Sequence, residues 1–207
     1  MDDRQIIETV MRSNIIDMAL TFTAMMRVFS KGSKGRIASK FEEVCPQLTA
    51  VKSRDDYEQI HRSFCDWFVG EIRTAHKTLK NGKPKASRPA SYGHAAKIFD
   101  IAMKVYVYYS SQPSSNAAAH VTPLLHGAID KPIMDYLKAT YSDKAVTAST
   151  IEQIDRNQYI KLQGLISKDI VRSFAGSVLP VQYDDIMWSK LNRNWRSPNE
   201  RVHYFYP

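Results

Sequence analysis

Residues 92–110 constrain the fold of this chain more than any other segment. Apolar side chains fall on most of the circumference of the helix that these residues would form. A helix that is apolar nearly all round has to be buried by other elements. The spacing of Lys97, Asp100 and Lys104 favours a helix over a strand here. We therefore predict a central, buried helix over 92–110, with Ser91 as its N-cap.

The rest of the chain predicts amphipathic helices packed around this centre. Apolar residues recur every three to four positions in residues 4–29 and 54–79, and Ser53 with Asp56 resembles a capping box. Asp130 followed by Pro132 predicts a helix start, and a second capping box predicts a helix over 149–174. Shorter helices are expected at 36–44 and 184–194. The sequence thus predicts a single all-α domain of six to seven helices over residues 1–207.

Two segments interrupt the helical pattern. Residues 80–90 hold one glycine and two prolines among basic residues, which predicts a basic loop. Residues 111–129 are rich in Ser, Pro and Ala and predict a long irregular connection.

Cysteine usage and hydropathy bear on the compartment. Cys45 and Cys65 are the only cysteines, with no C-x-x-C pair, which predicts buried thiols in a reducing compartment. No export signal follows the acidic N-terminus, and no run of about 18 apolar residues predicts a membrane span. We expect a cytoplasmic protein.

Positive charge is concentrated just before the central helix. Lys and Arg total 29 against 21 acidic residues, and residues 77–97 contain no acidic residue. Such a run suits phosphates, and a tyrosine within it suits base stacking. His94, Lys97, Asp100 and Lys104 share one face of the central helix and form a polar stripe that continues the run. We expect this stripe to lie on the exposed side of the helix. The predicted DNA- or RNA-binding residues are Lys77, Lys80, Lys83, Lys85, Arg88, Tyr92, His94, Lys97 and Lys104. A solvated loop and a strip of weak ion pairs would explain the same residues.

A second candidate is a polar site that includes Asp100, His126 and Asp130. His120, His126 and Asp130 lie within eleven residues and could bind a metal or act as an acid and a base. Their spacing matches no metal template, and a histidine packed on the core with Asp130 as a helix cap is the alternative. The common catalytic motifs, including G-x-S-x-G and H-E-x-x-H, are absent. The sequence therefore predicts no metal and no cofactor.

Three Arg/His spacings resemble the motif of the HEPN ribonucleases. This all-helical family cleaves RNA with an arginine and a histidine separated by four to six residues. The matching pairs are Arg54/His61, Arg88/His94 and Arg196/His203. About one such match is expected by chance in a chain of this composition. The resemblance implies an RNA-cleaving enzyme as an alternative function.

The segment Tyr92-Gly93-His94-Ala95-Ala96-Lys97, followed by Lys104-Val105-Tyr106, resembles part of an uncharacterised prokaryotic all-helical family. In that family a Tyr-Gly-x-Ala-x-Lys helix precedes a turn with His, Pro and Asp, as in residues 126–132. The resemblance implies a helical fold and no particular function.

A last alternative is a protein–protein interaction module, including a homo-oligomer. Met25 and Met26 of the methionine-rich first helix would suit such an adaptable surface.

Overall fold

Helix α4 (Tyr92–Met103) lies at the centre of the molecule, as the sequence predicts. It packs against α1 (Asp3–Phe22), α3 (Arg54–Glu71) and α7 (Arg156–Phe174), and most of its side chains are buried. Ser91 caps it as expected, because its hydroxyl accepts a hydrogen bond from the His94 amide at 3.3 Å.

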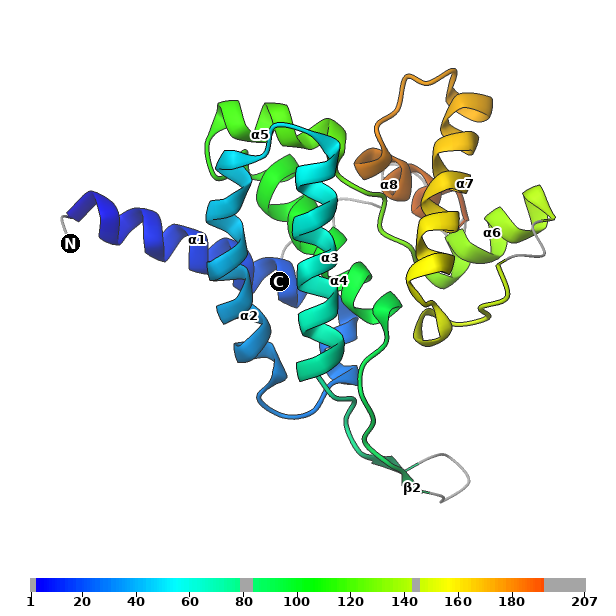
Figure 1. Cartoon of the computed structure of the whole chain (residues 1–207), viewed down its shortest axis with the longest axis horizontal. Helices are drawn as coiled ribbons and strands as arrows, with labels where there is room; N and C mark the ends of the chain where they lie inside the picture. The colour runs from blue at the N-terminus through cyan, green and yellow to red at the C-terminus, as the bar shows by residue number, and fades with distance from the viewer. Residues whose placement is uncertain (1–2, 79–83, 143–145, 192–207) are drawn as a thin grey trace, which may run out of the picture.

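The computed structural model describes residues 3–78, 84–142 and 146–191, which form a single all-α domain (Figure 1). The remaining helices are α2 (Ser33–Val44), α5 (Ser115–Val121), α6 (Lys131–Tyr141) and α8 (Pro180–Leu191). In Figure 1, α6, α7 and α8 lie together on one side of α4, and α1, α2, α3 and α5 lie on the other. Short 3₁₀ turns cover 24–28, 45–50, 122–124 and 151–153. No helix in these ranges has the length and apolarity needed to cross a membrane.

The end of the central helix differs from a regular α-helix. The chain continues beyond Met103 as a π-helical segment, η3 (Lys104–Tyr109), within the predicted span 92–110. Residues 104–107 of this segment are all buried, as are residues 93–96 in the regular part of the helix. π-Helical turns inside α-helices are frequent at functional sites.

The first helix is shorter than predicted. It ends at Phe22, because the Thr23 hydroxyl accepts a hydrogen bond from the Met25 amide at 3.2 Å and starts a 3₁₀ turn. Met25 and Met26, which the sequence suggests for an interaction surface, are half-buried against the core. Several exposed apolar side chains, among them Ile7, Val10 and Met18, lie earlier in α1, which extends away from the body (Figure 1).

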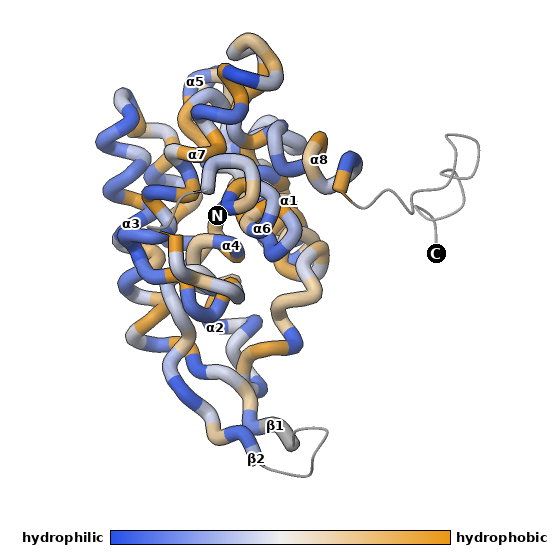
Figure 2. Tube along the Cα trace, turned by 90° about the vertical axis from the view of Figure 1, so that its right-hand side faces the viewer, coloured by the Kyte–Doolittle hydropathy of each residue, from blue (hydrophilic) through white to orange (hydrophobic). Residues whose placement is uncertain are grey.

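A small hairpin replaces part of the predicted basic loop. Strand β1 (Lys77–Thr78) pairs antiparallel with β2 (Pro84–Lys85), and Lys77 lies opposite Lys85 in the register. Both views show this hairpin projecting from the helical body (Figures 1 and 2). The predicted residues Lys80 and Lys83 lie outside the described residues, as do Arg196 and His203.

The prediction that Ser149 caps a helix over 149–174 is wrong at its start. Asp155 is the cap of α7, since its carboxylate accepts a hydrogen bond from the Gln158 amide at 2.8 Å. The preceding residues are instead held against the start of α4, where the Gly93 amide donates to the Ile154 carbonyl at 2.9 Å. A Cβ at Gly93 would lie 2.2 Å from the Ile151 carbonyl oxygen, so this approach requires glycine.

Candidate functional site

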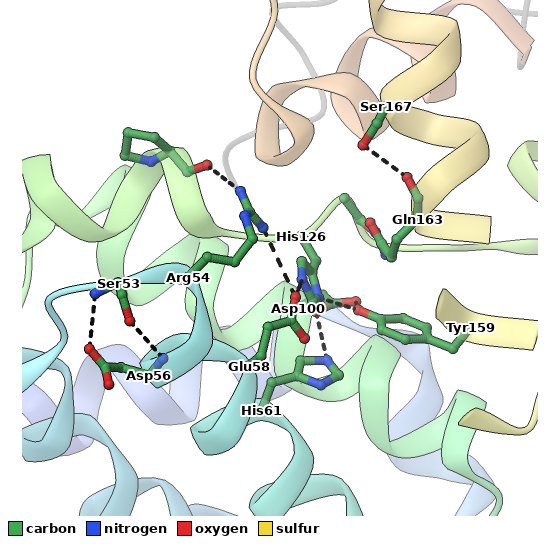
Figure 3. Close-up of polar contacts among 12 residues, drawn as sticks. Ser53, Arg54, Asp56, Glu58, His61, Asp100, His126, Tyr159, Gln163 and Ser167 are labelled. Atoms are coloured by element: carbon green, nitrogen blue, oxygen red, sulfur yellow. Dashed lines mark hydrogen bonds and ion pairs between the residues drawn. The ribbon is translucent and has the colours of Figure 1, made fainter. Parts of the chain in front are cut away.

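Helix α3 brings one histidine and one glutamate to the centre of the domain. The predicted capping box is present: the Ser53 hydroxyl accepts from the Asp56 amide, and the Asp56 carboxylate accepts from the Ser53 amide (Figure 3). Beyond this cap, His61 lies on the buried face of α3 and Glu58 lies closer to solvent. The local capping thus fixes where α3 begins and which face meets α4.

Five side chains from four segments meet in a buried polar cluster, shown in Figure 3. We call it the His–Asp cluster: Glu58 and His61 from α3, Asp100 from α4, His126 from the connection before α6, and Tyr159 from α7. The Tyr159 hydroxyl lies 2.9 Å from Asp100 Oδ2 and 2.8 Å from His126 Nδ1. The other ring nitrogen of His126 lies 2.8 Å from Glu58 Oε1. His61 Nε2 lies 3.4 Å from Asp100 Oδ1.

Aromatic rings enclose the cluster and fix the orientation of its imidazoles. The His61 ring stacks on Tyr159 with centroids 5.0 Å apart, and the edge of Phe99 closes a further side. The Tyr57 ring meets His126 edge-on. His61, Asp100 and His126 are all buried, although polar residues of these types are seldom buried without partners. These three side chains are therefore desolvated.

Burial shifts the pKa values of these groups toward their neutral forms. It raises the pKa of Asp100 to about 7 and lowers the pKa of His61 to about 4. Burial raises the pKa of Tyr159 well above its ordinary range, and the nearby Asp100 charge adds to this effect. Burial opposes ionisation of Glu58 as well, but the hydrogen bond and charge interaction with His126, together with the charges of His61 and Arg54, outweigh it and lower the pKa of Glu58.

Two arrangements of protons satisfy the contacts among Asp100, Tyr159 and His126. In the first, the Tyr159 hydroxyl donates to an Asp100 carboxylate, and a His126 imidazolium donates to Tyr159 and to Glu58. In the second, protonated Asp100 donates to Tyr159, which donates to a neutral His126. The two arrangements interconvert by proton transfer along Asp100, Tyr159 and His126. The contacts therefore form a continuous path for a proton.

Two atoms of the His–Asp cluster have no hydrogen-bond partner among the residues that the structure describes. They are His61 Nε2 and Asp100 Oδ1, which face each other at 3.4 Å without the alignment of a hydrogen bond. A buried polar atom without a partner costs about 1–3 kcal/mol. A cation that accepts an electron pair from each of the two atoms would remove this cost.

The spacing of these atoms fits a metal ion. Ligand atoms of His61, Asp100 and His126 all lie within 4.8 Å of one another. Two ligands about 2.0–2.1 Å from a tetrahedral ion are about 3.3–3.4 Å apart, which matches the pair formed by His61 and Asp100. Two imidazoles and a carboxylate suit first-row divalent ions such as zinc and iron.

A cavity of about 250 Å³ adjoins the cluster. Glu58 and Tyr159 belong both to the cluster and to the cavity wall, and Asp55, Arg62 and Arg156 complete its polar lining. A small polar molecule in this cavity would therefore lie one side chain away from His126 and Asp100.

The predicted exposed stripe on the central helix is wrong. His94, Asp100 and Lys104 are buried, and Lys97 is half-buried. Each buried member has partners on distant elements or on its own cap: Asp100 meets Tyr159, Lys104 meets Asp184 and Asp185, and His94 Nδ1 accepts from the Ser91 amide. The stripe is therefore not a continuation of the basic surface.

Two described residues of the basic run pair with an acidic residue. Lys85 lies 3.4 Å from Glu152, and Arg88 forms an ion pair with the same carboxylate. Tyr92 lies at the first turn of α4, half-buried beside the smaller cavity. The predicted residues thus divide between the hairpin and the interior of the domain.

The structure brings together two of the three residues of the predicted polar site, Asp100, His126 and Asp130. Asp100 and His126 meet through Tyr159, but Asp130 caps α6 and accepts from the Ile133 amide at 3.0 Å. His120 is exposed at the end of α5. The prediction did not include Glu58, His61 or Tyr159 in this site. One signal was available for His61: it lies four residues from both Tyr57 and Cys65, on the apolar face of its helix.

The Arg/His pairs do not form a shared site within the described residues. Arg54 donates to the Pro123 carbonyl at 3.3 Å and lies 4.0 Å from Glu58, while His61 faces Asp100. Arg88 binds Glu152, and His94 completes the cap of α4. The ribonuclease alternative thus stays a prediction that rests on spacing.

Comparison with known proteins gives no relative. No protein-family model matches the chain, and no curated protein or solved structure shows significant similarity to it. Inference about function therefore rests on the geometry described above.

Proposed function

We propose that this protein binds a first-row divalent metal ion through His61 Nε2, Asp100 Oδ1 and one ring nitrogen of His126. The observation that supports the proposal is the facing pair of unsatisfied atoms, His61 Nε2 and Asp100 Oδ1, at a separation suited to tetrahedral ligands. The His126 ligand atom lies within 4.8 Å of the other two, and the ring would complete the set by moving toward the ion and exchanging the hydrogen bond of one nitrogen for the metal. The ion would compensate both buried atoms at once.

The surroundings favour a catalytic centre over a structural one. Structural zinc sites are closed by four protein ligands, whereas catalytic sites have three and an open position. Here three ligands adjoin a cavity through Glu58 and Tyr159. Glu58 and Tyr159 hydrogen-bond to the proposed ligands, as outer partners do in metal sites. The proposed function is a metal-dependent enzyme in which Glu58 exchanges protons with a substrate or water.

The test is a calorimetric titration of the full chain, freed of metal with a chelator, with Zn²⁺ and with Co²⁺. We expect one ion per chain and a higher unfolding temperature, since about a hundredfold excess over Kd adds about 2.7 kcal/mol to stability. Asp100→Asn keeps the side-chain size and should weaken binding at least a hundredfold, as should His61→Ala. His120→Ala removes an exposed histidine and should change the affinity less than twofold.

Asp100→Asn also separates ligation from folding. It removes an ionisable group that burial disfavours, so the metal-free variant should unfold within about 1 kcal/mol of the parent. The proposal fails if the parent chain binds no ion, or if Asp100→Asn and His120→Ala bind alike.

We propose nucleic-acid binding by the hairpin as a second function. The observation that favours it is the register, which places Lys77 opposite Lys85 on two paired strands. Binding of a short RNA or DNA should weaken steeply with salt, and the double variant Lys77→Gln/Lys85→Gln should reduce the slope by about 2. Lys161→Gln, on the exposed side of α7, is the control. An absence of binding at low salt contradicts this second function.

A further inference from the structure

A second and larger cavity, of about 590 Å³, lies on another side of the central helix. It is lined by residues of α1, α4, η3, α6 and α8. Its apolar walls come mainly from Phe22, Ile101, Val105, Ile133 and Trp188. This size and this mostly apolar lining are typical of small-molecule sites. Phe22 and Trp188 are 64% and 44% exposed, so the cavity has an apolar mouth open to solvent.

Most charges in this cavity have partners within the protein. Lys104, from the π-helical turn, binds Asp184 and lies 2.8 Å from Asp185 Oδ1. The Tyr109 hydroxyl donates to the other oxygen of Asp185. Asp130 is engaged as the N-cap of α6. Asp130 and Asp185 are therefore compensated by a helix N-terminus, a cation and a phenol, whereas Asp184 has Lys104 on one oxygen and, among the described residues, no hydrogen-bond partner on the other, Oδ1.

Lys97 is different. Among the residues that the structure describes, its ammonium forms no hydrogen bond and no ion pair within 4 Å. Burial lowers the pKa of Lys97, although the charges of Asp130 and Asp184 act in the opposite direction. The cavity thus contains one half-buried cation that lacks a direct partner next to an apolar wall.

We propose that this cavity binds a monocarboxylate with an apolar body, its carboxylate on Lys97 and its body against Ile101, Val105 and Trp188. A charge-assisted hydrogen bond to Lys97 would replace the hydration that burial removes. An aliphatic chain would fill the apolar part, where each buried CH₂ contributes about 0.8 kcal/mol. This site does not depend on the proposed metal centre, which uses Asp100 on another side of α4.

The test compares three probes of equal length: octanoate, octanol and octylamine. We expect octanoate to bind most tightly by calorimetry, at least tenfold more tightly than octanol. Removing two CH₂ groups, as in hexanoate, should weaken binding about tenfold or more, because each group is worth about a factor of four. Quenching or enhancement of Trp188 fluorescence, lost in Trp188→Phe, should follow the same order.

Lys97→Met tests the role of the ammonium. The variant keeps an unbranched apolar stem, so it should fold, which its unfolding temperature checks. The variant should bind octanoate at least tenfold more weakly than the parent, and its affinity for octanol should change less than twofold. Lys161→Met, on the exposed side of α7, should leave both affinities unchanged. The proposal is wrong if octylamine binds more tightly than octanoate, if Lys97→Met binds octanoate normally, or if none of the probes binds saturably.

Discussion

The buried polar groups on the two sides of the central helix are compensated in different ways. On one side Asp100 is enclosed by imidazoles and Tyr159, with a cavity of about 250 Å³ beside the cluster. On the other side Lys104 meets Asp184 and Asp185 at the edge of a cavity of about 590 Å³. The first side has little space and two unsatisfied atoms that face each other. The second has a larger cavity and mostly paired charges, and Asp184 Oδ1 is the atom there that lacks a hydrogen-bond partner among the described residues.

This difference indicates what each side is able to bind. Facing, unsatisfied donor atoms without intervening space suit a single ion. An apolar cavity with one unpaired ammonium suits an organic anion. A helix that is buried all round can therefore support two separate sites, provided that its polar residues point in different directions. The following predictions test whether the two sides differ in this way.

The largest effect is expected from Lys104→Met. This change leaves Asp184 buried without its cation, and breaking a buried pair from one side costs about 3–5 kcal/mol. We expect a loss of about 3 kcal/mol, because Asp185 is partly exposed to solvent. The free energy of unfolding in urea measures it.

A double variant distinguishes loss of the pair from loss of packing. Lys104→Met combined with Asp184→Asn should recover more than half of the lost stability, since no uncompensated charge then remains at position 184. If the double variant is no more stable than Lys104→Met, the ion pair is not what holds this side together.

A smaller effect is expected at the His–Asp cluster from Tyr159→Phe. The hydroxyl orients both Asp100 and His126, and loss of such outer partners usually weakens metal binding by 10–100-fold. We expect about a tenfold loss of Zn²⁺ affinity by calorimetry. Tyr141→Phe, whose hydroxyl binds Asp169 instead, should have no effect. Equal Zn²⁺ affinities for the parent, Tyr159→Phe and Tyr141→Phe would show that Tyr159 does not position the ligands.

The last prediction concerns pH. Burial raises the pKa of Asp184 from 3.8 to about 7, mainly because Lys104 only partly compensates its desolvation. Between these values the folded chain binds more protons than the unfolded chain, so this group makes stability fall as pH rises. The slope is at most about 1.4 kcal/mol per pH unit. The free energy of unfolding, measured between pH 4.5 and 7, should depend less on pH in Asp184→Asn than in the parent. Parallel curves for the two proteins would contradict this prediction.

Local signals in the sequence predicted much of the fold. The caps at Ser53, Ser91 and Asp130 are present, and the helix that begins at Tyr92 is buried as its apolar circumference predicts. Both cysteines are buried and free. These features depend on residues within one or two helical turns, which periodicity and capping rules describe.

The polar sites depend on long-range contacts and were harder to predict. Asp100 meets a partner 59 residues away, and Lys104 meets one 80 residues away. Within α4 alone the same residues resemble an exposed stripe with i, i+4 spacing. Nothing local distinguishes a polar stripe in water from one that several distant elements cover. The π-helical segment that begins at Lys104 was not predicted either, and its first residue is held by Asp184 and Asp185 of α8.

The most direct test of the metal centre is a crystal structure of the chain with bound Co²⁺ or Zn²⁺, located by anomalous scattering. We predict one strong peak about 2.0–2.2 Å from His61 Nε2 and from Asp100 Oδ1, with His126 moved to complete the ligands. Peaks only at the exposed histidines His76 and His120, with His61 and Asp100 unchanged, would contradict the proposal.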